Sequence, residues 1–107
     1  MKPFPVPKDQ RTEPYWKELN KVIDPELGIG VVDLGLIYNV EIDGENATVT
    51  MTLTSPGCPV GPQIMHQVEL AMLGIDGITS PRVEITWDPP WNQDLIDQDI
   101  RDLMWGF

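Results

Sequence analysis

The chemistry that this 107-residue chain offers centres on its single cysteine, Cys58. Cys58 lies in the run Thr54-Ser55-Pro56-Gly57-Cys58-Pro59, between a strand-like segment and a helix-like segment. A thiol at the start of a helix lies among free backbone N–H groups, which lower its pKa and make it more reactive. The hydroxyl groups of Thr54 and Ser55 add donors to a thiolate or a sulfur ligand. We therefore favour a functional thiol over the alternative, a small buried hydrophobic residue.

Two positions fit the start of the helix that follows Cys58. If Pro59 takes the first helical position, Cys58 caps the helix, and this is the start that we favour. If the helix starts instead at Pro62, with Gly61 as its cap, Cys58 lies in the loop just upstream. In either case His66, the only histidine, falls about 160° from the apolar stripe of the helix. We therefore expect His66 on the surface rather than paired with the thiol.

Two carboxylates flank a proline in the run Asp24-Pro25-Glu26, which is typical of a rigid turn. Either they offer oxygens to a metal, a partner amide or a basic residue, or Asp24 makes a local bond to the backbone and Glu26 is solvated. From the residues alone the local interpretation is favoured. Trp91 follows two prolines, so it is a candidate surface contact for a partner, and packing over a sheet edge is the alternative.

The composition excludes several classes of protein. With 17 acidic residues and a net charge of −10, the chain repels nucleic acid and anionic membranes. It has neither a signal-peptide pattern nor the roughly 18 apolar residues of a membrane span, so we expect a cytoplasmic protein. One cysteine and one histidine do not provide a four-ligand zinc site without carboxylates. The residues alone give no complete catalytic site.

The hydrophobic patterning predicts one domain over residues 12–107, preceded by a flexible, proline-rich arm over residues 1–11. The expected elements are a helix from Thr12 to before Pro25, strands over 37–42 and 47–53, the helix after Cys58, a strand over 82–87, and a helix from Asp94. We expect Ile23, Trp87 and Leu103 to face the core. This α-β-β-α-β-α order predicts an α+β two-layer sandwich, with a small mixed β-sheet and helices on one face.

Four stretches, taken together, resemble one known family. They are Ile23–Gly28, Val32–Tyr38, Met51–Pro59 and Trp87–Trp91, and they occur in the family's order and with family-like spacing. The chain resembles the small iron–sulfur cluster assembly domain family, which includes SufT-like proteins, PaaD-like proteins and the eukaryotic cytosolic targeting factor. It looks like a stand-alone, single-domain member.

The resemblance implies roles for particular residues. In the family the motif cysteine, here Cys58, is the reactive position, and we expect it to be a transient ligand of iron or of a cluster. The acidic turn, here Asp24 and Glu26, lies near that cysteine in a cleft with the motif threonine, here Thr54. We include Ser55 in the same cleft as a neighbouring hydroxyl.

The resemblance also implies a non-enzymatic adaptor in iron–sulfur cluster assembly or in delivery to apoproteins. Its partners would be scaffold or carrier proteins and recipient apoproteins. No cofactor would be stably bound, because a cluster usually needs four cysteines; a homodimer or a shared site would supply the missing sulfur for a transient cluster. Three alternatives remain: a thiol-dependent enzyme that uses Cys58 with Asp24 or Glu26 as base, a PaaD-like accessory protein of a ring-hydroxylating oxygenase system, and a purely structural interaction module in which the cysteine is incidental. The second is less favoured, because the extra C-terminal cysteines of that branch are missing.

Overall fold

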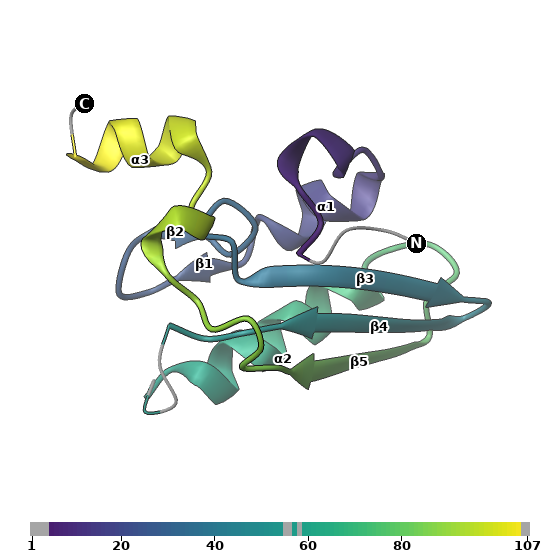
Figure 1. Cartoon of the computed structure of the whole chain (residues 1–107). Helices are drawn as coiled ribbons and strands as arrows, with labels where there is room; N and C mark the ends of the chain where they lie inside the picture. The colour runs from purple at the N-terminus through teal and green to yellow at the C-terminus, as the bar shows by residue number, and fades with distance from the viewer. Residues whose placement is uncertain (1–4, 55–56, 58, 106–107) are drawn as a thin grey trace.

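The computed structural model of the chain describes residues 5–54, 57 and 59–105. Its main sheet has the strand order β3-β4-β5, with β3 at Ile37–Asp43, β4 at Asn46–Met51 and β5 at Ser80–Ile85. A hairpin makes β3 antiparallel to β4, and β5 pairs parallel with β4 (Figure 1). Two shorter strands, β1 (Ile23–Asp24) and β2 (Ile29–Gly30), form a separate antiparallel pair. The predicted α+β class and mixed sheet are confirmed.

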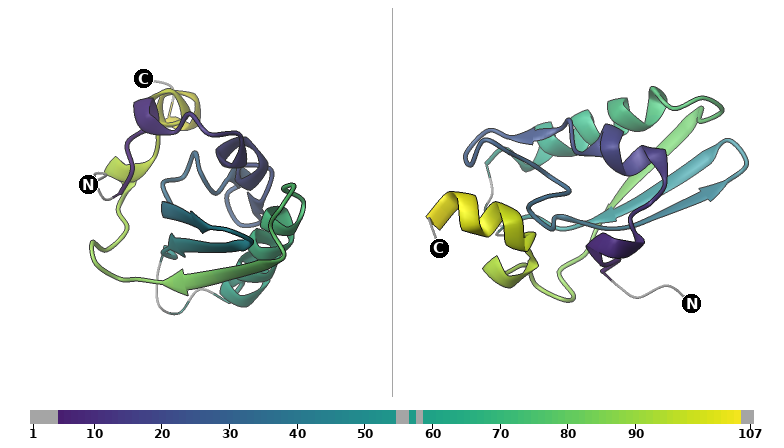
Figure 2. Two further views of the ribbon diagram at one scale, coloured as in Figure 1. Left: turned by 90° about the vertical axis from the view of Figure 1, so that its right-hand side faces the viewer. Right: turned by 90° about the horizontal axis from the view of Figure 1, so that it is seen from above.

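Two of the helices, α1 (Pro14–Leu19) and α2 (Gly61–Leu73), cover one face of the main sheet (Figure 2). Helix α2 connects β4 to β5, as a parallel pair of strands requires. The core between these layers includes alternate residues of β4 and the inner face of α2: Ala47, Val49, Met51, Ile64, Val68 and Met72. The remaining helix, α3 (Gln98–Trp105), lies beyond the end of the sheet (Figure 1). No helix in the described residues has the length and apolar character needed to cross a bilayer.

The start of α2 differs from the one that we favoured. The helix begins at Gly61, with Val60 as its N-cap and Pro62 at the second position. A start at Pro59 would have placed Pro62 where an N–H must pair within the helix, whereas the first N–H groups have no such partner. The alternative start, one residue away at Pro62, was therefore nearer. Cys58, the predicted cap, lies outside the described residues.

The first helix is shorter than predicted, because α1 ends at Leu19 and does not continue to Pro25. Trp16 and Leu19 are buried, but Ile23 is 45% exposed, and Val22 occupies the core instead. The run Asp24-Pro25-Glu26 was predicted as a rigid turn, and in the structure the turn lies between two short strands, β1 and β2. Once the helix has ended, the 3.6-residue spacing no longer indicates which side chains face inward.

Residues 5–11, which lie in the predicted flexible arm, pack onto the domain in the structure. Val6 is 2% exposed, and its N–H donates to the carbonyl of Tyr38 at 2.9 Å. A short 3₁₀ helix, η1 (Lys8–Gln10), follows. Proline-rich composition suggested disorder, but one buried valine and one strand contact keep this segment in place.

The segment after β5 is hydrogen-bonded to the start of β3. The Tyr38 hydroxyl donates to the carbonyl of Pro89 at 2.7 Å. Farther along, a second 3₁₀ helix, η2 (Gln93–Leu95), is capped by Asn92. Trp87, predicted in the core, is 43% exposed, since β5 ends at Ile85 before the alternation reaches it. The expectation for Leu103 was also wrong, as this side chain is 82% exposed.

Gly35, two residues before β3, lies close to Leu95 in this later segment. Its φ is +76°, and a Cβ built there would overlap the carbonyl of Leu95. Gly35→Ala is therefore expected to lower the free energy of unfolding by about 2 kcal/mol, from the left-handed backbone and the overlap together. Gly44→Ala is the matched control, because Gly44 has φ +61° and no atom within 4 Å of such a Cβ. Urea unfolding measures both, and equal losses would contradict the proposed overlap.

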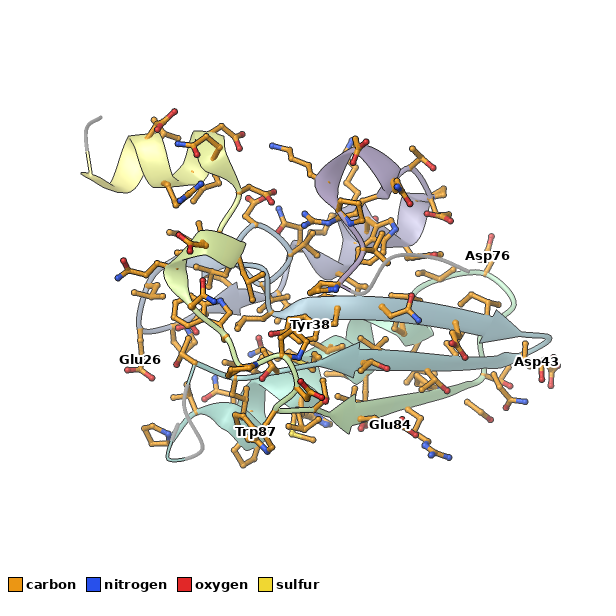
Figure 3. The ribbon with its side chains drawn as sticks, in the orientation of Figure 1. Glu26, Tyr38, Asp43, Asp76, Glu84 and Trp87 are labelled. Atoms are coloured by element: carbon orange, nitrogen blue, oxygen red, sulfur yellow. The ribbon has the colours of Figure 1, made fainter. Side chains whose placement is uncertain are left out.

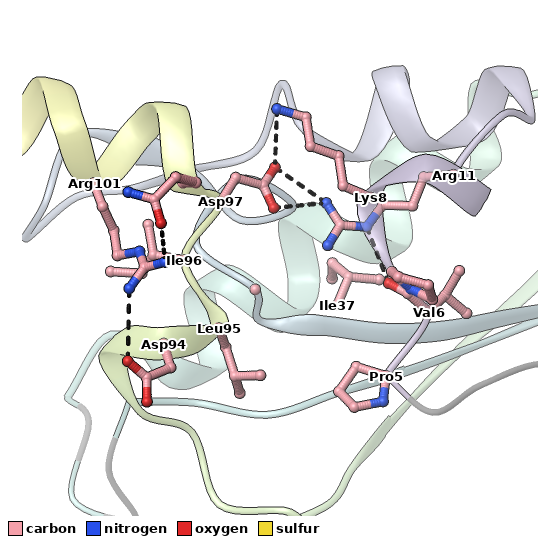
Figure 4. Close-up of a pocket in the computed structure, with 13 residues that line it drawn as sticks. Pro5, Val6, Lys8, Arg11, Ile37, Asp94, Leu95, Ile96, Asp97 and Arg101 are labelled. Atoms are coloured by element: carbon pink, nitrogen blue, oxygen red, sulfur yellow. Dashed lines mark hydrogen bonds and ion pairs between the residues drawn. The ribbon is translucent and has the colours of Figure 1, made fainter.

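An ion pair joins the N-terminal segment to the segment just before α3 (Figure 4). The Arg11 guanidinium donates from Nη1 to both carboxylate oxygens of Asp97, each at 3.2 Å, and from Nε to the carbonyl of Val6. Lys8 adds a longer contact of 3.8 Å to Asp97. Burial raises the pKa of the Asp97 carboxyl, and the charges of Arg11 and Lys8 oppose this rise. The pair borders a hollow of about 430 Å³.

Candidate functional site

The turn between β1 and β2 is organised by Asp24, which is 2% exposed. Its Oδ1 accepts the backbone N–H of Glu26 at 2.8 Å and that of Leu27 at 3.2 Å. The N–H of Gly28, which has φ +71°, donates to the Asp24 carbonyl at 2.7 Å. These bonds agree with the local interpretation of Asp24, whose side chain closes the turn between β1 and β2.

A small hollow lies beside this turn and has a volume of about 230 Å³. Its lining comes from three separate segments of the chain: Asp24, Glu26, Leu27, Thr54 and Trp91. We call this feature the acidic hollow. Figure 3 labels Glu26 on the left-hand side of the molecule. The structure thus brings together four residues that were singled out from the sequence, and it adds Leu27, which was not.

Trp91 is held by a hydrogen bond from its indole Nε1 to the carbonyl of Leu34, at 2.8 Å. The ring is partly buried and packs against the core. Because the indole N–H already donates to the Leu34 carbonyl, Trp91 contributes the carbon atoms of its ring to the lining of the hollow. This packing agrees with the packing interpretation of Trp91 from the sequence, and contact with a partner stays a prediction.

Thr54 reaches the hollow at the end of a well-anchored stretch. The N–H of Thr52, a fully buried residue, donates to the carbonyl of Leu36 at 2.8 Å. Leu53 is buried as well, and Thr54 is half-buried. Ser55 and Cys58, the other two predicted site residues, lie outside the described residues. Their predicted roles are thus untested by the geometry.

The other titratable candidates do not join the site. His66 is exposed on α2, as predicted. Among the residues that the structure describes, no three His, Cys, Asp or Glu side chains are grouped so as to hold a metal ion. The chemistry visible at the acidic hollow is therefore that of two carboxylates, one hydroxyl and two apolar walls. Leu27 is an apolar residue within a polar turn sequence, and this is the signal that could have added it to the sequence prediction. Its side chain is 42% exposed in the structure.

Comparison with known proteins gives a consistent result. The model of a family described as iron-sulfur cluster assembly protein matches residues 16–85. The Fe-S protein maturation auxiliary factor SufT of Staphylococcus aureus is 53% identical over 78 residues, which cover 72% of this chain and 89% of that protein. The Fe-S protein maturation auxiliary factor YitW of Bacillus subtilis is 46% identical over 81 residues, with 75% and 79% covered.

A solved structure agrees with the fold. The crystal structure of a domain of unknown function, DUF59, from Bacillus anthracis superposes with a TM-score of 0.80 at 36% identity. The similarity covers 84% of this chain and 87% of that one. The family match ends at Ile85, so it includes Asp24, Glu26, Thr54 and Cys58 but not Trp91. One wall of the acidic hollow therefore comes from outside the matched range.

Proposed function

The chain belongs to the iron–sulfur cluster assembly protein family, and from this premise we propose that it is an accessory factor that helps deliver clusters to apoproteins. Cys58 would be the transient ligand of iron or of a cluster. The observation that supports this proposal most is the acidic hollow, in which Asp24, Thr54 and Trp91 meet. Thr54 precedes Cys58 by only four residues in the sequence. Relatives named as maturation auxiliary factors support the same role.

The proposed factor is an adaptor rather than an enzyme or a store. Its single cysteine supplies one of the four thiolates that usually hold a cluster. A cluster in transit would therefore share its ligands with a scaffold or carrier protein, with the recipient apoprotein, or with a second copy of this chain. A weakly held cargo suits transfer, because tight binding would slow its release.

The role of Asp24 can be separated from its structural bonds. Asp24→Asn keeps an Oδ1 that accepts both turn N–H groups but removes the charge, so we expect stability to change by less than about 1 kcal/mol. Cluster transfer from a loaded carrier to an apoprotein is expected to slow by about tenfold, the usual value of one charge-assisted hydrogen bond. Asp24→Ala, which also removes the acceptor, should lose about 1–2 kcal/mol of stability in addition.

Thermal melts and a transfer assay followed by visible absorbance measure the two effects. If Asp24→Asn transfers clusters at the normal rate while Asp24→Ala does not, the carboxylate serves only the turn. A matched control for charge is Asp76→Asn, because Asp76 is exposed at the opposite end of the molecule from Glu26 (Figure 3). This variant should match the unmodified protein in both assays.

A further inference from the structure

We propose that the acidic hollow receives an arginine side chain of the partner protein, so that the partner docks beside Thr54. This inference rests on the proposed function, since it names the chemistry by which the adaptor recognises its partner. The argument uses the hydrogen bonding of Asp24, the charge of the lining, and the size and apolar walls of the hollow.

Asp24 provides an acceptor that no described residue fills with a hydrogen bond. The backbone N–H groups of Glu26 and Leu27 both donate to the same side-chain oxygen of Asp24, Oδ1. Among the hydrogen bonds of the described residues, none reaches Oδ2, although the residue is 2% exposed and lines the hollow. A carboxylate oxygen that is largely removed from water is costly without a donor. A donor that enters through the hollow would meet this need.

The charge of the lining favours a cation as that donor. Asp24 and Glu26 contribute two carboxylates, and the described lining contains no lysine, arginine or histidine. The chain as a whole has a net charge of −10, so its field attracts basic groups and speeds their approach. A neutral donor would gain neither effect.

The size and the walls of the hollow favour a side chain over a free ion or a larger ligand. Its volume of about 230 Å³ is below the roughly 300–1,000 Å³ of small-molecule pockets. Leu27 and Trp91 offer no oxygen or nitrogen ligand to a bare metal ion, which takes six or more oxygens in a calcium site, for example. They do offer an apolar surface to a methylene stem.

Arginine fits this combination better than lysine. A guanidinium is planar, is more weakly hydrated than an ammonium, and stacks on aromatic rings while donating to carboxylates in its plane. The indole of Trp91 is fixed by its bond to Leu34, so stacking would cost little side-chain entropy. One guanidinium N–H would reach Oδ2 of Asp24, and Thr54 and Glu26 would border the remaining donors.

The test is a titration of the ¹⁵N-labelled full chain with the blocked peptide acetyl-Gly-Arg-Gly-amide, followed by NMR. We expect saturable shifts of the Trp91 indole N–H and of the backbone N–H of Leu27. The analogue with citrulline, which has the same shape without the charge, should bind about tenfold more weakly or worse, as should the lysine peptide. Asp24→Asn should weaken binding of the arginine peptide to a similar degree, and Asp76→Asn should leave it unchanged.

Three results would overturn the proposal: no saturable shift at these groups, equal binding of the citrulline peptide, or equal binding by Asp24→Asn. Saturation by Fe²⁺ alone at the same groups, with no response to the arginine peptide, would also overturn it and assign the hollow to a metal. The titration contains neither a cluster nor an apoprotein. Failure of peptide binding is therefore distinguishable from failure of the delivery function, which the transfer assay measures separately.

Discussion

Replacing Asp97 with alanine is expected to lower the free energy of unfolding by about 3 kcal/mol. The side chains of Asp97 and Arg11 are only 5% and 10% exposed, so the variant leaves a guanidinium that is nearly buried and unpaired. A buried ion pair adds little net stability when it is intact, but removal of one partner costs several kcal/mol. Urea unfolding followed by circular dichroism gives the loss.

The double variant Arg11→Met/Asp97→Leu is the control for this prediction, since it removes both charges and keeps apolar volume. It should recover most of the stability that Asp97→Ala loses. A loss below about 1 kcal/mol in Asp97→Ala would contradict the account, because it would mean that water already solvates Arg11.

The raised pKa of Asp97 gives the same pair a pH dependence of known sign. The folded state favours the protonated carboxyl more than the unfolded state does, so this contribution is complete below the ordinary pKa of 3.8. It is lost as the pH rises through the raised pKa. The free energy of unfolding of the unmodified protein minus that of Asp97→Asn should therefore be more positive at acidic pH than at neutral pH.

Cys58→Ser is expected to abolish cluster transfer while the fold is kept. A hydroxyl is a hard ligand that does not replace a thiolate on iron, so the variant would lack the only cysteine sulfur of the chain. Gly57 and Pro59, on either side of Cys58 in the sequence, are exposed, so neither of these two neighbours adds to the core. The transfer assay and a thermal melt measure the two properties.

The reactivity of the thiol provides a second measurement. Alkylation by iodoacetamide across a range of pH should give a pKa for Cys58 below the roughly 8.5 of a free cysteine. Normal transfer by the serine variant would remove Cys58 from the mechanism. A thiol that reacts only when the protein unfolds would instead identify a core residue.

The sequence was most informative where a pattern is local and regular. The alternation of Ala47, Val49 and Met51 predicted the buried face of β4, and the spacing of Ile64 and Val68 predicted that of α2. The spacing of apolar residues follows directly from the period of a strand or a helix, so it indicates which side chains share a face. The start of α2 was ambiguous because two prolines, three residues apart, each fit the first turn of a helix.

Contacts between distant segments could not be predicted in the same way. Val6 pairs with Tyr38, and Arg11 pairs with Asp97, which is 86 residues away. Nothing in the spacing of prolines and charges near the N-terminus indicates these partners. Trp87 was assigned to the core because the alternation of β5 was extended beyond Ile85, where the strand ends.

The candidate site was only partly within reach of sequence analysis. The turn chemistry of Asp24 follows from a short carboxylate before a proline, and the geometry agrees. That Asp24, Thr54 and Trp91 line one hollow depends on how three segments pack, and only the family resemblance suggested that the first two are close. The resemblance itself is confirmed by the family match over residues 16–85.

The segments before and after residues 16–85 both contact the rest of the domain, and this limits where the chain can be shortened. A protein shortened to the family-matched residues 16–85 would lose Arg11 and Asp97 together, along with the buried Val6, which is hydrogen-bonded to Tyr38 in β3. It would also lose Trp91, and with it one wall of the acidic hollow. A soluble truncation that fails in delivery would therefore say nothing about Cys58. Fusions and affinity tags belong outside residues 5–105, so that the segments on either side of the family-matched range keep their partners.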